Sequence, residues 1–82
     1  MNLQHIEERL LIIFRNANGW LPESQLADMQ SLVNAGEPGI ALENFCTQLE
    51  EYNVTVPQVV RHELIELALE MGMQPSRWIL RL

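Results

Sequence analysis

Acidic side chains are the groups in this 82-residue chain whose types and spacing could do chemistry. Glu63, Glu66 and Glu70 follow one another at three and four residues, so on a helix they share one face. A second set precedes them at similar spacing and consists of Glu43, Thr47, Glu50 and Glu51. Such residues could form a general acid and base, hold a cation, or present an anionic surface to a cationic partner.

Catalysis and metal binding are the weaker interpretations of these residues. A carboxyl group acts as a general acid near neutral pH where an apolar pocket raises its pKa, but these glutamates fall at outward positions of the helices expected below. His62 and Glu66 have the spacing of two metal ligands, whereas zinc takes three or four. We therefore expect no enzymatic activity, no metal and no cofactor. The seven residues of the two sets are candidates for binding a partner, and a solvated helix face is the alternative.

The charge balance indicates what kind of partner would fit. The chain has eleven acids against five arginines and no lysine, for a formal charge of −6. Phosphate contacts need clustered cations, so direct binding to nucleic acid is disfavoured and a cationic partner is favoured. The same balance also fits a protein whose charge serves only solubility.

Nothing in the sequence predicts a membrane span or a disulfide. The longest apolar run, residues 10–14, is far shorter than the roughly 20 residues that a spanning helix needs. The first residues include Glu7 and Glu8 and lack the basic start of a signal peptide, so we expect a cytoplasmic protein. Cys46 is the one cysteine and falls on the apolar side of a helix, which predicts a buried structural thiol.

Proline and glycine divide the chain into the elements that must position these residues. Apolar residues recur at helical spacing over residues 3–15, 22–35, 38–52 and 56–71, and no segment alternates long enough to predict a strand. We expect an all-α fold, a compact antiparallel bundle of four helices with a short C-terminal fifth helix, as a single domain over residues 1–82. In the tail, Trp78 and Leu82 would seal the bundle, and Arg77 and Arg81 would pair with the acids of the preceding helix.

Local signals set the helix boundaries. Gly36 and Gly72 fall just past the second and fourth helices, where a left-handed residue commonly ends a helix. Residues 55–58, Thr-Val-Pro-Gln, fit a capping box at the start of the fourth helix, and Val54 with Val59 fits the hydrophobic staple around it.

The block from Gly36 to Val56 carries a family resemblance. Gly36-Glu37-Pro38-Gly39-Ile40-Ala41-Leu42-Glu43, then Phe45-Cys46 and Leu49-Glu50-Glu51-Tyr52-Asn53-Val54, resembles the central signature of small bacterial immunity proteins of the MafI-like and contact-dependent growth inhibition (CdiI-type) families. The likeness extends over about residues 21–78, with Met71-Gly72 and Trp78 as further counterparts. Thr47, Glu50 and Asn53 depart from the types common in such families, and these departures bear on which toxin is bound.

The resemblance implies a bacterial cytoplasmic immunity protein that neutralises a cognate toxin domain by stoichiometric occlusion. The toxin would be a basic nuclease, an EndoU-like RNase being one family-level example, and the immunity protein would be a monomer before it binds. An acidic helical surface could fill the cleft in place of nucleic-acid phosphates. The alternative from a different class is a helical adaptor or regulatory module that binds a partner helix in an apolar groove lined by Leu and Met side chains.

Overall fold

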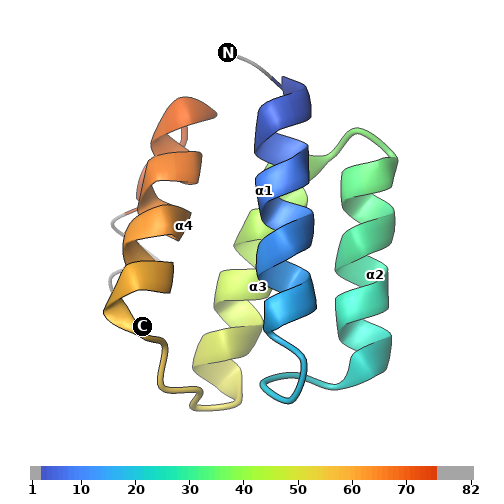
Figure 1. Ribbon diagram of the computed structural model, residues 1–82, viewed down its shortest axis with the longest axis vertical. Coiled ribbons are helices and arrows are strands. Elements are labelled where there is room, and N and C mark those ends of the chain that lie inside the picture. The colour runs from blue at the N-terminus through green and yellow to red at the C-terminus, as the bar shows by residue number, and fades with distance from the viewer. Residues whose placement is uncertain (1–2, 76–82) are drawn as a thin grey trace.

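Four helices make up the part of the chain that the structure describes, residues 3–75 of a computed structural model (Figure 1). They are α1 (Leu3–Asn16), α2 (Glu23–Asn34), α3 (Pro38–Glu51) and α4 (Gln58–Glu70), and each runs antiparallel to the one before it. No strand occurs among the described residues, so the expected all-α class and the four helices are confirmed. The expected fifth helix, with Arg77, Trp78, Arg81 and Leu82, lies outside the described residues.

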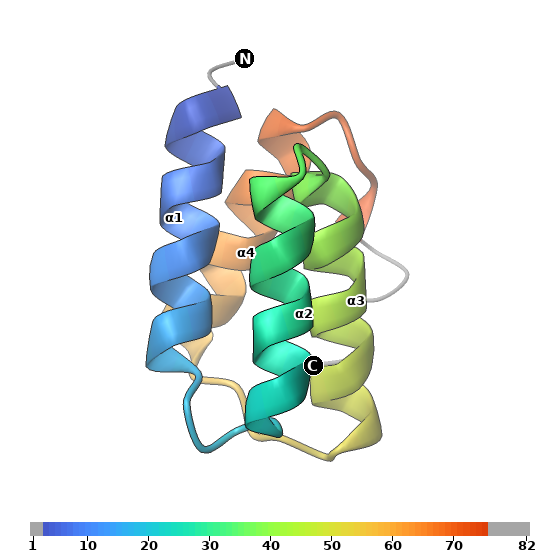
Figure 2. The same cartoon turned by 90° about the vertical axis from the view of Figure 1, so that its right-hand side faces the viewer.

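The core forms where α1, α2 and α3 meet, with α4 closing it (Figures 1 and 2). Phe14 of α1 and Phe45 of α3 are fully buried and pack in a tilted arrangement with ring centroids 4.9 Å apart. α1 packs against both α2 and α3. Burying a side chain such as Leu10 or Leu64 stabilises the fold by about 1.5–3 kcal/mol, so these residues hold the helices in place.

Two apolar residues that fall at helical spacing in the sequence are exposed because they lie where a helix begins or ends. Leu3, the first residue of α1, is 42% exposed, and Tyr52, at the C-cap of α3, is 48% exposed. The Tyr52 hydroxyl accepts a hydrogen bond from Nε2 of Gln25 at 3.1 Å, which ties the end of α3 to α2. Both positions have the periodicity of the core but reach beyond it.

Three helices end in the same left-handed geometry. Gly36, Asn53 and Gly72 have φ of 82°, 53° and 73°. After α3, the amide of Val54 donates to the carbonyl of Leu49 and the amide of Asn53 to that of Glu50, the paired bonds of a Schellman motif. The two glycines confirm the boundaries predicted from the sequence, and Asn53 is a third such end.

The predicted capping box and staple of the fourth helix are wrong. α4 begins at Gln58 with Pro57 at its N-cap position and no capping side-chain hydrogen bond, and Val59 is 80% exposed. A cap at Thr55 would require helical geometry at Val56, but the residue before a proline is disfavoured in that region. Val56 is instead buried in the connection between α3 and α4.

Candidate protein-binding surface

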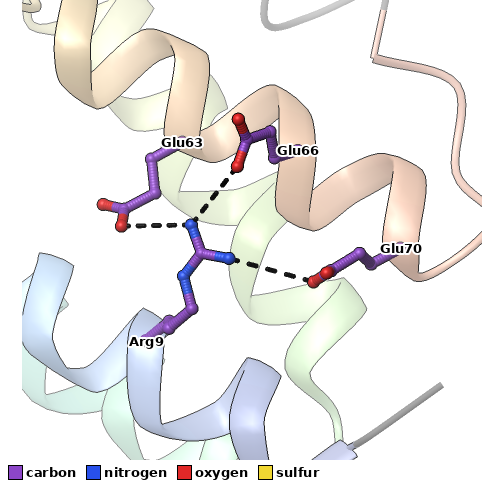
Figure 3. A network of polar contacts seen from close by, with 4 residues as sticks. All are labelled: Arg9, Glu63, Glu66 and Glu70. Atoms are coloured by element: carbon purple, nitrogen blue, oxygen red, sulfur yellow. Dashed lines mark hydrogen bonds and ion pairs between the residues drawn. The ribbon is translucent and has the colours of Figure 1, made fainter.

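The acids of α4 converge on one cation, Arg9 of α1 (Figure 3). Nη2 of Arg9 lies 3.2 Å from Oε2 of Glu63, where it donates a hydrogen bond, and 3.7 Å from Oε2 of Glu66. Nη1 lies 4.0 Å from Oε2 of Glu70. The three- and four-residue spacing that places the glutamates on one face of α4 is what allows a single guanidinium to contact all three.

This network changes the electrostatic character of the α4 acids. Three carboxylates and one guanidinium leave two negative charges in place of three. The Arg9 side chain is only 23% exposed, whereas that of Glu66 is 66% exposed. Arg9 therefore lies in the seam between α1 and α4, and the acids reach from it into solvent. A cationic partner at this seam would compete with Arg9 for the same carboxylates.

The residues predicted on the third helix lie on the outward face of α3. Glu43, Thr47, Glu50 and Glu51 are all exposed. Glu43, Thr47 and Glu50 follow at four and three residues and form one strip, while Glu51 lies one step further round the helix. α3 and α4 are antiparallel neighbours, but the α4 acids lie on the side of α4 that contacts α1. The two predicted sets therefore lie on different faces of the bundle, one on the outward face of α3 and the other beside α1.

Both ends of the α3 strip are fixed by local structure. The left-handed Gly36 and the buried Pro38 at the first position of α3 set where the helix begins. The left-handed Asn53 and the hydrogen bond from Gln25 to Tyr52 set where it ends. The block from Gly36 to Val56 therefore includes the residues that bound α3. A strip held in this way presents its side chains on a rigid element.

An apolar groove opens at the end of the bundle where α1 and α3 begin and α4 ends. Its volume is about 350 Å³. Leu3, Ile40, Met71 and Met73 supply apolar walls, and Glu37 and Glu43 line it as well. Glu43 thus belongs both to the α3 strip and to this groove.

The other reactive groups of the described residues offer little chemistry. Cys46 is fully buried, and desolvation by burial raises the pKa of its thiol to about 12, so the nucleophilic thiolate is scarce at neutral pH. Within residues 3–75, His, Cys, Asp and Glu side chains nowhere gather in a group of three or more that could hold a metal ion. Over the same residues, each helix is too short or too polar to cross a membrane.

Two features of this surface were not predicted from the sequence. The first is the ion-pair network of Arg9. The sequence shows that Arg9 directly precedes the core residue Leu10 and so lies beside the apolar face of α1, but its partners lie 54 or more residues away along the chain. The groove combines the first residue of α1 with residues near the ends of α3 and α4, which only the packing brings together.

Comparison with protein-family models, with curated proteins and with solved structures finds no match to this chain.

Proposed function

We propose that this protein acts by binding another protein, as an immunity protein that neutralises a cognate bacterial toxin domain in the cytoplasm. The observation that carries the proposal is the set of exposed acids on α3, Glu43, Glu50 and Glu51, in a chain of formal charge −6. An anionic surface on a rigid helix complements a basic cleft such as that of a nuclease, and charge complementarity speeds encounter. The resemblance of residues 36–56 to immunity proteins supports the choice of partner.

Binding is favoured over catalysis by the setting of the reactive groups. The glutamates of both sets are exposed or half-exposed, and the one cysteine is buried with a raised pKa. Catalytic carboxyls and nucleophiles are instead usually placed in clefts that tune their pKa values. We propose that the inhibitor is not an enzyme, needs no cofactor and is a monomer until it meets its partner.

The size of such a complex sets how much of the molecule must take part. A stable interface buries about 800 Å² on each partner. The whole chain exposes 5035 Å², so close to a sixth of its surface would be covered. The α3 strip would therefore have to act together with neighbouring surface, for which the groove beside Glu43 and the acids of α4 are the candidates.

The test is growth rescue. The C-terminal domain of the protein that the gene immediately upstream encodes is expressed in cells as the candidate toxin, with and without this protein, and with an unrelated immunity protein as control. Specific rescue is the expected result. Growth arrest despite co-expression of folded protein would refute the immunity function.

Charge-reversal variants then test the surface. Glu51→Lys should weaken toxin binding and reduce its salt dependence, because it removes an acid from α3. Asp28→Lys is the matched control, since it changes the net charge equally from an exposed position on α2. Equal effects of the two variants would mean that only overall charge matters. Glu66→Lys is less suited, because it would place a second cation beside Arg9.

A second candidate function is an adaptor that binds a partner helix. The groove lined by Leu3, Ile40, Met71 and Met73 favours it, because an amphipathic helix places its apolar face in such a depression. Salt separates the two functions. Association with a nuclease cleft should slow strongly as salt rises, whereas an apolar helix-in-groove contact should change little.

A further inference from the structure

The groove at the end of the bundle exposes apolar surface that the fold leaves uncovered among the described residues. Leu3 is 42% exposed and Ile40 48% exposed, and both are large apolar side chains that line it. Met71 and Met73 complete the walls with flexible thioether side chains, which adapt to differently shaped partners. Exposed apolar surface gathered in a depression is typical of an interaction site.

The residues around the groove specify the charge of what would fit. Glu37 and Glu43 are its charged lining residues, and no cation lines it within residues 3–75. Its volume of about 350 Å³ is at the lower end of the range for small-molecule pockets, and it is a shallow depression that is largely open to solvent. These properties suit an apolar side chain presented by another protein, with a cation beside it to meet the carboxylates.

We propose that this groove binds the anchor segment of the protein partner, a short amphipathic segment whose apolar side chains enter between Ile40 and Met73 and whose neighbouring Lys or Arg pairs with Glu43. Glu43 also begins the acidic strip of α3, so groove and strip form one continuous recognition surface. The inference rests on the proposed function for the identity of the natural partner. It adds the apolar contact that gives such a complex its affinity, while the acids steer the encounter.

Methionine methyl groups provide the readout in the full-length protein. For the experiment, the protein is labelled with ¹³C-methyl methionine. Met71 and Met73 then report on the groove, and Met29, which is buried in the core, is the internal control. The probe is an amidated helical peptide with two leucines one turn apart flanked by arginines, on an alanine and glutamine background. A second peptide has glutamate in place of each arginine. We expect the arginine peptide to shift the Met71 and Met73 signals and leave Met29 unchanged.

Matched variants locate the binding. Ile40→Ser should weaken the arginine peptide about fivefold, because it removes about half a side chain of apolar contact. Ile12→Ser is its control, since Ile12 is 51% exposed on α1 and does not line the groove. Glu43→Gln should weaken the peptide about two- to threefold, and Glu51→Gln, about 12 Å along α3, should have no effect.

Several results would overturn the proposal. These are unmoved Met71 and Met73 signals at saturating peptide, equal effects of Ile40→Ser and Ile12→Ser, and equal binding of the two peptides. Shifts of Met71 and Met73 with protein concentration alone would identify a second copy of the chain as the occupant. If Ile40→Ser still rescues growth and binds the toxin with full affinity, the groove proposal is refuted and the immunity function stands. If the peptide binds as expected but the protein gives no rescue from the toxin, the immunity function is refuted and the groove proposal stands.

Discussion

Replacing Arg9 with methionine removes the cation on which the three α4 glutamates converge and keeps an unbranched apolar stem. Arg9 contacts Glu63, Glu66 and Glu70 at 3.2, 3.7 and 4.0 Å, and its side chain is 23% exposed. Methionine should preserve the packing between α1 and α4, because a long apolar side chain replaces the stem of the arginine. The variant therefore isolates the charge.

The expected loss follows from the exposure of each pair. The hydrogen-bonded contact to Glu63 involves two side chains that are 23% and 38% exposed, and a pair of this kind contributes about 0.5–1 kcal/mol. The longer contacts to Glu66 and Glu70 are screened by solvent and contribute about 0.2–0.5 kcal/mol each. Arg9→Met should lower the free energy of unfolding by about 1–2 kcal/mol in total. A chain of this length has a total stability of about 4–12 kcal/mol, so the change is readily measured.

Urea unfolding at low and high salt is the assay. At 1 M salt the Debye length falls to about 3 Å, so the loss should shrink to about half of its low-salt value. Arg15→Met is the control, because Arg15 is an exposed residue of the same helix, and it should change stability by about 0.5 kcal/mol or less. A double-mutant cycle with Glu63→Gln should give a coupling of about 0.5–1 kcal/mol. A loss independent of salt, or a coupling under about 0.3 kcal/mol, would refute the electrostatic account.

Three further predictions concern the thiol, the helix ends and the start of α4. Burial raises the pKa of Cys46 from 9.0 to about 12, so the contribution of the protonated thiol to the free energy of unfolding is complete below pH 9 and is lost as pH rises from 9 to 12. Between pH 8 and pH 10, the free energy of unfolding in urea should fall by about 1.4 kcal/mol more in the wild type than in Cys46→Ala. Equal falls in the two proteins would contradict this account. In thermal unfolding, Gly36→Ala should lower the stability by about 1–2 kcal/mol, because Gly36 has a φ of +82°. Gly39→Ala within α3 places its new methyl group 3.5 Å from Sδ of Met73, an ordinary contact, and should be neutral or stabilise the protein by up to about 1 kcal/mol. The opposite order would refute the backbone argument. In urea unfolding, Val59→Ser should change the free energy of unfolding by about 0.5 kcal/mol or less, and Val56→Ser should lower it by about 1–3 kcal/mol, because of the two only Val56 is buried. Similar losses in the two variants would restore the predicted staple.

Much of the fold could be predicted because its signals are local. Apolar residues at helical spacing predict four helices, and their bounds agree with α1 to α4 to within one or two residues. Gly36 and Gly72 mark helix ends because few other residues adopt positive φ without strain. The boundary at α4 failed for a local reason as well, since the effect of Pro57 on Val56 outweighs the cap that Thr55 could form.

The candidate surface could be predicted only in part, because it depends on which helices meet. The sequence indicates that Glu63, Glu66 and Glu70 share a face, but not that this face meets α1, so it cannot assign them Arg9. The groove likewise draws on residues from Leu3 to Met73, which no periodicity relates. The exposure of Glu43, Thr47, Glu50 and Glu51 agrees with their positions on α3, and their role in binding stays a prediction.

The seam between α1 and α4 has a consequence for which bundle this chain adopts. Helices joined by short connections can be arranged in two mirror-related ways around the same apolar core, and apolar packing alone discriminates weakly between them. Placing α4 on the opposite side of α3 would separate Arg9 from all three of its carboxylates. The ion pairs therefore contribute to the energy gap between the competing topologies as well as to the stability of the native one, and we expect them to favour the handedness of this bundle.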